Sequence, residues 1–103
     1  MVAPTAMRVT GRNPGSSCVH TREDGADPDF VFTFCHLDSI GVTVGQRLAR
    51  GDVMGVEGNR GLSTGTHLHV EIARPEAPDN TFNNPAFALN PQPILIEKGA
   101  WAA

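Results

Sequence analysis

The sequence lacks a long hydrophobic run, and its positive charge is not gathered into a patch. No apolar segment approaches the ~18 residues that a membrane helix requires, and the start, MVAPTAM, has neither a basic region nor a hydrophobic secretion segment. The formal net charge is -3, and the arginines are scattered along the chain. Surfaces that bind nucleic acid or anionic membranes need clustered Lys and Arg. We therefore expect no nucleic acid and no membrane among the partners.

Cysteine is scarce, and glycine and proline are plentiful. The 2 cysteines, Cys18 and Cys35, are too few for a four-thiolate zinc site, which leaves a disulfide or two buried thiols as alternatives. The 103 residues are 40% hydrophobic and include 11 Gly and 8 Pro, a composition typical of one folded, loop-rich domain. We expect a single domain over residues 1–95 and a C-terminal tail over residues 96–103.

Residues 17–21 and 30–37 are rich in β-branched and aromatic types, and the turn-forming acidic segment REDGADPD lies between them. This pattern predicts a β-hairpin. If Cys18 lies opposite Cys35, His20 faces Thr33, and His36 lies on the opposite face from His20. The register rests on symmetry about the loop.

Glycine recurs through residues 41–61 at a density that helices do not tolerate, which predicts short strands joined by tight turns. Residues 66–72 then alternate with period 2, so that one face carries apolar residues and the other carries His67, His69 and Glu71. After residue 75 the chain is rich in Pro and Asn, with one turn of helix expected near residues 85–89. The predicted class is all-β, with antiparallel sheets of short strands.

His67 and His69 project from the same side of the predicted strand, with Cβ atoms about 7 Å apart. This geometry suits a metal ligand beside a general base, although a solvated strand face also carries two histidines by chance. Gly61 and Gly65 let the backbone approach a ligand closely. His36 ends an earlier strand, where a third imidazole can face a polarised water or an oxyanion.

Three ordered motifs resemble one family. These are His36-Leu37, the segment VGQRLARGDVMG at residues 44–55 and the segment STGTHLHVE at residues 63–71. Together they resemble the C-terminal half of lysostaphin-type zinc metallopeptidase domains, which cut peptide cross-links in bacterial cell walls. Asn84-Pro85 or Asn90-Pro91 resembles the Asn/Asp-Pro that closes such a domain. The resemblance implies that His69 is a zinc ligand, His67 the general base and His36 the group that stabilises the transition state.

One motif of the family is missing from the sequence. The family's two other zinc ligands come from an upstream His-x-x-x-Asp motif, and residues 1–11 resemble the stretch just after it. The resemblance therefore implies a barrel-sandwich hybrid fold (duplicated hybrid motif) that is incomplete at its N-terminus. Its sheet then has an unpaired edge, which favours pairing with another protein chain. His20 and Asp24 have the spacing of the missing ligands but lack the motif's glycine.

Two functions follow from the resemblance. The first is a peptidoglycan endopeptidase, a zinc metalloendopeptidase if a complete Zn²⁺ site can be assembled, acting on peptidoglycan peptides through metal-activated water. The second is a pseudoenzyme, a metal-free module with a structural or cell-wall-binding role. A bacteriophage virion or the bacterial cell envelope is a plausible location for either.

Other functions fit less well. A lipoyl or biotinyl carrier domain needs a lysine in a tight turn, and the single lysine, Lys98, lies in the tail. The segment GNRGLSTG lacks the Gly-Lys-Ser/Thr of a phosphate loop and leads into a strand. A serine hydrolase using Ser63 and Asp52 lacks a nucleophile elbow and ranks third.

Oxidation of Cys18 and Cys35 is expected to stabilise the fold. If the two cysteines face each other, a disulfide closes a loop of about 16 residues and contributes about 3 kcal/mol to the free energy of unfolding. Denaturant unfolding of the oxidised and reduced protein measures this difference. The mass of the protein before and after reduction checks the bond itself, and an unchanged mass contradicts the pairing.

Overall fold

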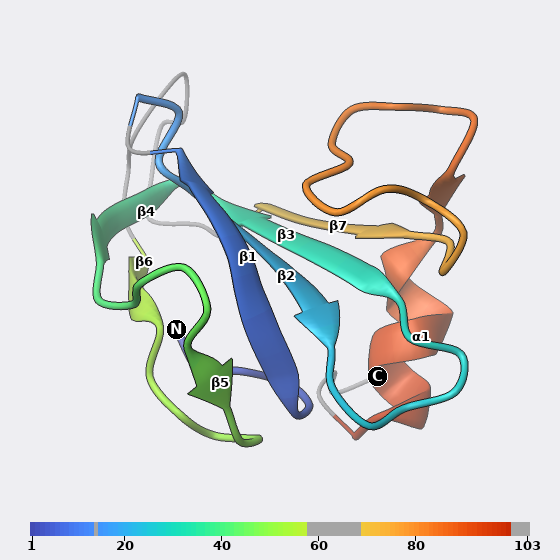
Figure 1. The fold of residues 1–103 in the computed structure, drawn as a ribbon, viewed down its shortest axis with the longest axis horizontal. Coiled ribbons are helices and arrows are strands. Elements are labelled where there is room, and N and C mark those ends of the chain that lie inside the picture. The colour runs from blue at the N-terminus through green and yellow to red at the C-terminus, as the bar shows by residue number, and fades with distance from the viewer. Residues whose placement is uncertain (14, 58–68, 100–103) are drawn as a thin grey trace.

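The protein is built mainly from short antiparallel strands (Figure 1). The computed structural model describes residues 1–13, 15–57 and 69–99. Within these residues the elements are β1 (Met7–Asn13), β2 (Cys18–Glu23), β3 (Val31–Cys35), β4 (Leu37–Ile40), β5 (Arg47–Leu48), β6 (Gly55–Glu57), β7 (His69–Ala73), β8 (Ala88–Leu89) and α1 (Pro91–Glu97).

One sheet has the strand order β5-β1-β2-β3-β7-β8, and β4 pairs with β6 in a second sheet. Every strand pair is antiparallel. The predicted all-β, antiparallel class is therefore confirmed, including the short strands expected within residues 41–57. In the part of the chain that the structure describes, neither sheet closes into a barrel.

β2 and β3 form the predicted hairpin in the predicted register. His20 pairs with Thr33, and Cys18 is joined to Cys35 by a disulfide, with the Cα atoms 4.1 Å apart. β7 pairs with the other edge of β3 and places His69 opposite Cys35. Because directly paired residues share a face and successive residues alternate, this register assigns every side chain of the three strands to one of two faces.

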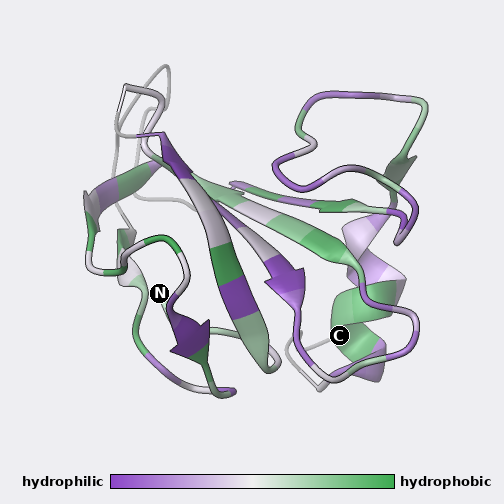
Figure 2. Ribbon diagram, in the orientation of Figure 1, coloured by the Kyte–Doolittle hydropathy of each residue, from purple (hydrophilic) through white to green (hydrophobic). Residues whose placement is uncertain are grey.

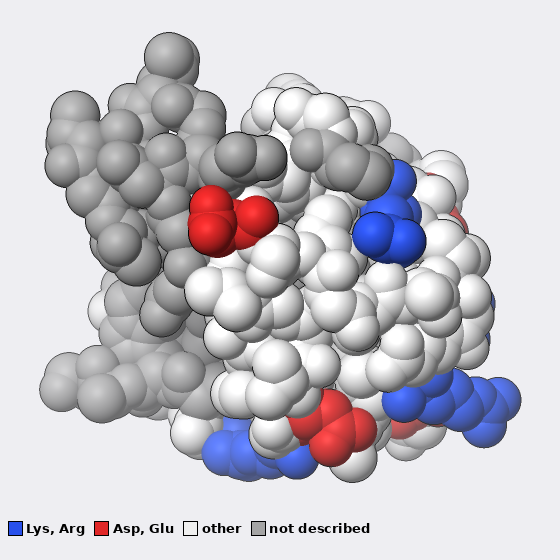
Figure 3. All heavy atoms as spheres, turned by 90° about the vertical axis from the view of Figure 1, so that its left-hand side faces the viewer, with Lys and Arg blue, Asp and Glu red and all other residues white. Residues whose placement is uncertain are grey.

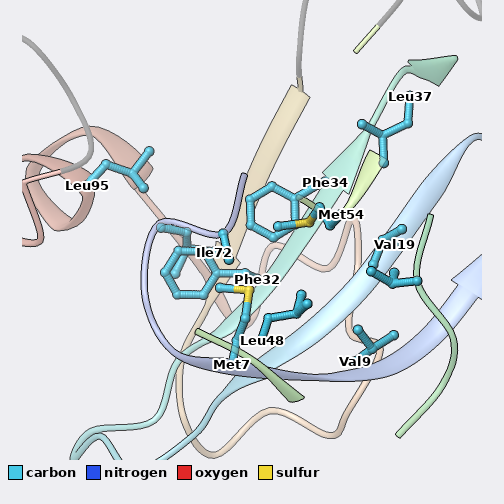
Figure 4. Packing of buried hydrophobic residues seen from close by; sticks show 12 residues of the cluster. Met7, Val9, Val19, Phe32, Phe34, Leu37, Leu48, Met54, Ile72 and Leu95 are labelled. Carbon is cyan, nitrogen blue, oxygen red and sulfur yellow. The ribbon is translucent and has the colours of Figure 1, made fainter. Parts of the chain in front are cut away.

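The first of these faces, the core face, is apolar and packs into the interior (Figure 4). Val19, Phe32, Phe34 and Ile72 are at most 1% exposed. Figure 2 shows alternating hydrophobic and hydrophilic residues along β1. Helix α1 packs on the same side and contributes Leu95, which is 5% exposed, to the cluster.

β1 is an inner strand that the sequence analysis did not predict. It lies between β5 and β2. Its sequence nevertheless carries a period-2 signal, since Met7 and Val9 are fully buried while Arg8 and Thr10 are partly exposed. A bulge between Val9 and Gly11 interrupts the register and shortens the alternating stretch.

Where one turn of helix was expected, near residues 85–89, the structure has a single hydrogen-bonded turn, and α1, which was not predicted, follows it. Residues 85–87 make a single turn closed by the bond from the Ala88 N–H to the Asn84 carbonyl (3.1 Å), and the chain then enters β8. α1 starts after Asn90, whose side chain accepts from the Gln92 N–H at 3.1 Å. Asn is a favoured N-cap, and proline is tolerated in the first turn, so the local sequence sets this start.

A buried ion pair holds the C-terminal segment on the core face. The Glu23 side chain is 0% exposed, and the Lys98 ammonium lies 2.7 Å from its Oε2. The Phe30 N–H and the Thr5 hydroxyl also donate to this carboxylate, at 3.2 and 3.3 Å. Arg50 donates to the Lys98 carbonyl at 2.7 Å. Among the described contacts of this carboxylate, Lys98 supplies the cation, so its charge is paired when the segment that follows α1 is docked.

The side of the molecule that carries β4 and β6 exposes valines. Val2, Val44, Val53 and Val56 are 47 to 66% exposed, and Figure 3 shows that charged side chains are sparse on the described part of this side. A partner chain that pairs with a sheet edge remains a prediction. Within the described residues, no helix is long and apolar enough to cross a membrane.

Replacing Lys98 with Met should lower the free energy of unfolding by about 2 to 3 kcal/mol, because Glu23 then keeps a buried charge without its cation. Urea unfolding measures the loss. Glu97→Gln, at an exposed position beside it, is the matched control and should change little. The double variant Glu23→Gln, Lys98→Met should recover part of the loss. A single Lys98 variant as stable as the parent contradicts this account of the ion pair.

Candidate active site

The sheet face opposite the core, which we call the groove face, carries polar and sulfur-containing side chains. By register it bears Cys18 and His20 from β2, Thr33 and Cys35 from β3, and His69 and Glu71 from β7. At one end of this face is an open hollow of about 220 Å³, lined by Ser16, Cys18, Cys35, His36, His69, Phe82 and Asn83. The hollow is the candidate site because two of the predicted histidines line it.

His36 reaches the hollow through a kink between β3 and β4. Its φ is 63°, a left-handed value that non-glycine residues seldom adopt, and Ser17 across the hairpin has φ 58°. The Leu37 N–H donates to the Ser17 carbonyl at 3.1 Å and fixes the kink. The His36 ring centroid lies 5.8 Å from that of His69. The expectation that His36 and His20 lie on opposite faces is therefore wrong, because alternation does not continue through a left-handed residue.

His69 is held by a carboxylate on its own strand. Its Nε2 lies 3.2 Å from Oε2 of Glu71, two residues along β7 on the same face. The other carboxylate oxygen of Glu71 accepts from the Asn83 N–H at 2.9 Å. The contact with Glu71 orients the imidazole. The ring is 46% exposed, so it remains open to the hollow.

Residues 74–87, which we call the covering loop, cross the groove face. Arg22 ties the loop to β2, since its Nε lies 2.6 Å from Oδ1 of Asp79. The same guanidinium donates to the carbonyls of Pro75 and Ala77, at 2.9 and 2.5 Å. These contacts set the position of the next residues of the loop, including Phe82.

Phe82 stands between two histidines. Its ring centroid is 6.0 Å from that of His20 and 6.3 Å from that of His69, and both contacts are edge-on. Edge-to-face contacts of this length are favourable for aromatic rings. The rings of His20, Phe82, His69 and His36 therefore form a row along the groove face, which we call the ring row.

His20 is a buried member of the ring row and lies apart from Asp24. Its Nδ1 is 2.9 Å from the Thr33 hydroxyl, and the residue is 8% exposed. Burial lowers the pKa of His20 below its ordinary value of 6.5, and the nearby charge of Glu71 opposes this shift. Asp24 instead pairs with Arg47, at 3.6 Å. The structure thus separates the two residues that have the spacing of the missing zinc ligands.

The structure brings two of the three predicted site residues together. His36 and His69 line the same hollow. His67, together with Gly61 and Gly65, lies outside the described residues. The roles assigned to these histidines remain predictions.

The donor set for zinc is incomplete among the described residues. A catalytic zinc ion takes three protein ligands and keeps one position open. Within residues 1–13, 15–57 and 69–99, no three His, Cys, Asp or Glu side chains gather closely enough to hold a metal ion. Both cysteines are bonded to each other. The described residues alone therefore do not fit a zinc site.

Sequence reasoning missed the partners of His69. Glu71 shares the predicted polar face with His69, so the period-2 pattern contained the signal for this contact. Phe82 and Asn83 lie in a Pro/Asn-rich segment without periodicity, and no local pattern indicates that they reach the histidines. Their placement depends on contacts with Arg22, which is distant in sequence.

Comparison with known proteins identifies the family of the chain. Residues 2–84 match Peptidase family M23, and the chain belongs to this family. Peptidoglycan DD-endopeptidase ShyA of Vibrio cholerae is 42% identical over 43 residues, which cover 42% of this chain and 10% of that protein. Glycyl-glycine endopeptidase ALE-1 of Staphylococcus capitis is 35% identical over 66 residues, which cover 64% of this chain and 17% of that protein. The chain thus spans a small part of these relatives.

Solved structures have a similar fold. The catalytic domain of the antimicrobial peptidase lysostaphin from Staphylococcus simulans superposes with a TM-score of 0.73 at 24% identity, over 93% of this chain and 69% of that chain. LytU gives a TM-score of 0.72 at 29% identity, over 92% of this chain and 63% of that chain. The predicted resemblance to lysostaphin-type domains is confirmed.

The lowered pKa of His20 should make the fold less stable in acid. Because the unfolded chain binds this proton more readily, the free energy of unfolding falls as the pH drops below 6.5 towards the lowered folded pKa. Urea unfolding between about pH 8 and about pH 5 measures the slope. The variant His20→Gln, which cannot titrate, should show a shallower slope. Equal slopes in the two proteins contradict the assignment.

Proposed function

We propose that this chain acts on the peptides of bacterial peptidoglycan as a hydrolase domain of the M23 type. Family membership and the two relatives named as endopeptidases support the substrate class. The observation that carries the proposal is the convergence of His36 and His69 on one open hollow, with ring centroids 5.8 Å apart. Two imidazoles beside one peptide bond supply the donors and acceptors that hydrolysis requires.

In this proposal, His36 acts on the carbonyl of the scissile bond. An imidazole N–H that donates to the carbonyl oxygen stabilises the negative charge that develops when water attacks. The kink with φ 63° brings His36 to the hollow before the substrate arrives, so little movement of the backbone accompanies the reaction. His67, which the resemblance makes the general base, takes the proton of the attacking water.

The covering loop supplies the other wall of the substrate site. Phe82 and Asn83 line the hollow together with His36 and His69. An extended peptide that lies between them contacts an aromatic ring on one side and imidazole groups on the other. Arg22 keeps this wall in place from outside the hollow, because it anchors the loop at Asp79.

The zinc-dependent form of the proposal needs further ligands. Among the described residues, His69 is the only one to which the resemblance assigns zinc, and no set of three potential ligands includes it. A zinc endopeptidase therefore takes its remaining ligands from outside the described residues or from a partner chain.

The incomplete set of zinc ligands among the described residues also favours a second candidate. This candidate is a module that binds cell-wall peptides in the same hollow without cutting them. Both candidates use the groove face, and they differ in metal content and turnover. A location in the cell envelope or in a phage virion is compatible with either.

The two candidates are separated by measuring bound zinc and cleavage on the same preparation. The hydrolase retains about one zinc per chain after dialysis and releases peptide fragments from purified peptidoglycan, and His69→Ala loses both. The binding module co-sediments with peptidoglycan but holds no zinc and releases no fragments. A chain that neither binds nor cleaves peptidoglycan contradicts both candidates.

For the hydrolase, replacing His36 with Ala should lower kcat about 100- to 1000-fold, as removal of an oxyanion donor does. Zinc content should persist, because His36 has no assigned role in it, and co-sedimentation with peptidoglycan should fall far less than kcat, because the other residues of the hollow still contact the peptide. Asp38→Asn, at an exposed position two residues away, is the matched control. A His36 variant that cleaves at the parent rate removes this residue from the mechanism.

A further inference from the structure

We propose that Glu71 is a positioning residue that fixes the tautomer of His69 and holds the wall of the hollow beside it. The inference rests on the proposed use of His69 in the site. It deepens that proposal, because the family resemblance assigns no role to Glu71. Two contacts carry it, one from each carboxylate oxygen.

The first contact fixes which ring nitrogen of His69 carries the proton. Oε2 of Glu71 lies 3.2 Å from the His69 Nε2. A carboxylate has no proton to donate, so the hydrogen bond requires the Nε2–H of the imidazole as donor. In the neutral ring the lone pair is then on Nδ1. A histidine that binds a metal or accepts a proton needs such a defined lone pair, and a carboxylate partner commonly fixes it.

The second contact ties the same carboxylate to the covering loop. Oε1 of Glu71 accepts from the Asn83 N–H at 2.9 Å. Asn83 has φ 55°, a left-handed value that asparagine adopts more readily than other non-glycine residues. Asn83 lines the hollow that His69 lines, and it also lines a second hollow of about 280 Å³ together with Glu71. The Glu71 carboxylate therefore holds both the His69 ring and the part of the covering loop that lines the hollow at Asn83.

The position of Glu71 in the sheet suits this role. It pairs with Thr33 on β3, so its backbone is held within the ladder between β3 and β7. Its side chain is 23% exposed, about half the value of the His69 ring. A surface ion pair without a role would not require a second contact in the loop, and it would tolerate an amide in place of the carboxylate.

The variant Glu71→Gln tests the tautomer directly. The amide has the shape of the carboxylate, and its oxygen must remain near the Asn83 N–H, because the amide NH₂ would oppose that donor. The NH₂ group then faces His69 and donates to it. The His69 Nε2 must become an acceptor, and the proton moves to Nδ1.

Nitrogen-15 NMR of the neutral His69 ring reads this change. The parent protein and the control Glu76→Gln, an exposed position in the covering loop, should both show a protonated Nε2. Glu71→Gln should show a protonated Nδ1 with the fold retained, as judged by the dispersion of its backbone amide signals. A parent protein with the proton on Nδ1, or a tautomer that Glu71→Gln leaves unchanged, overturns the inference. The parent spectrum decides this even if the variant does not fold.

Kinetics then separates the inference from the proposed function. Where the parent cleaves peptidoglycan, Glu71→Gln should lose about 10- to 100-fold in kcat with little change in KM, as the loss of a residue that orients a metal ligand does. A swapped tautomer with full activity overturns the positioning role. A parent that shows the expected tautomer but never cleaves peptidoglycan contradicts the hydrolase and leaves the assignment of Glu71 supported for the binding module.

Discussion

Backbone pairing among β2, β3 and β7 fixes the site, because in antiparallel strands the register decides which face each side chain occupies. Thr33 at the centre lies opposite His20 on one side and Glu71 on the other. A slip of one residue would turn Phe34 towards solvent and the imidazoles towards the core. Burial of Phe32 and Phe34, both 0% exposed, therefore stabilises the arrangement of the polar groups on the opposite face.

Each face of the sheet has a cover that is anchored by one cation. On the core side, α1 contributes Leu95, and Lys98 reaches the buried Glu23 just beyond the helix. On the groove side, Arg22 anchors the covering loop, with a side chain that is 15% exposed. The position of Phe82 against the histidines thus depends on a guanidinium that does not line the hollow. The shape of the site is a property of the whole sheet rather than of the histidine segment.

Residue types and the turn-forming loop between them were enough to predict the hairpin, and symmetry about that loop gave its register. Period-2 patterning predicted the polar face of β7. The position of His36 at a strand end suggested a third imidazole facing the site, and the resemblance assigned it a role. The kink that brings His36 there was not predictable, because Ser17 and His36 adopt left-handed backbone angles without glycine. The covering loop was missed for another reason. Its contacts with Arg22 join residues more than 50 positions apart, and no local propensity encodes them.

The central claim is that four rings, those of His20, Phe82, His69 and His36, line one face of the sheet. Both candidate functions depend on this row, whatever the metal content of the protein. Nuclear Overhauser spectroscopy on protein with labelled His and Phe rings tests it most directly. The account predicts cross-peaks between Phe82 and both His20 and His69, and between His69 and His36. Absence of the cross-peak between His69 and His36 in a folded sample would contradict it.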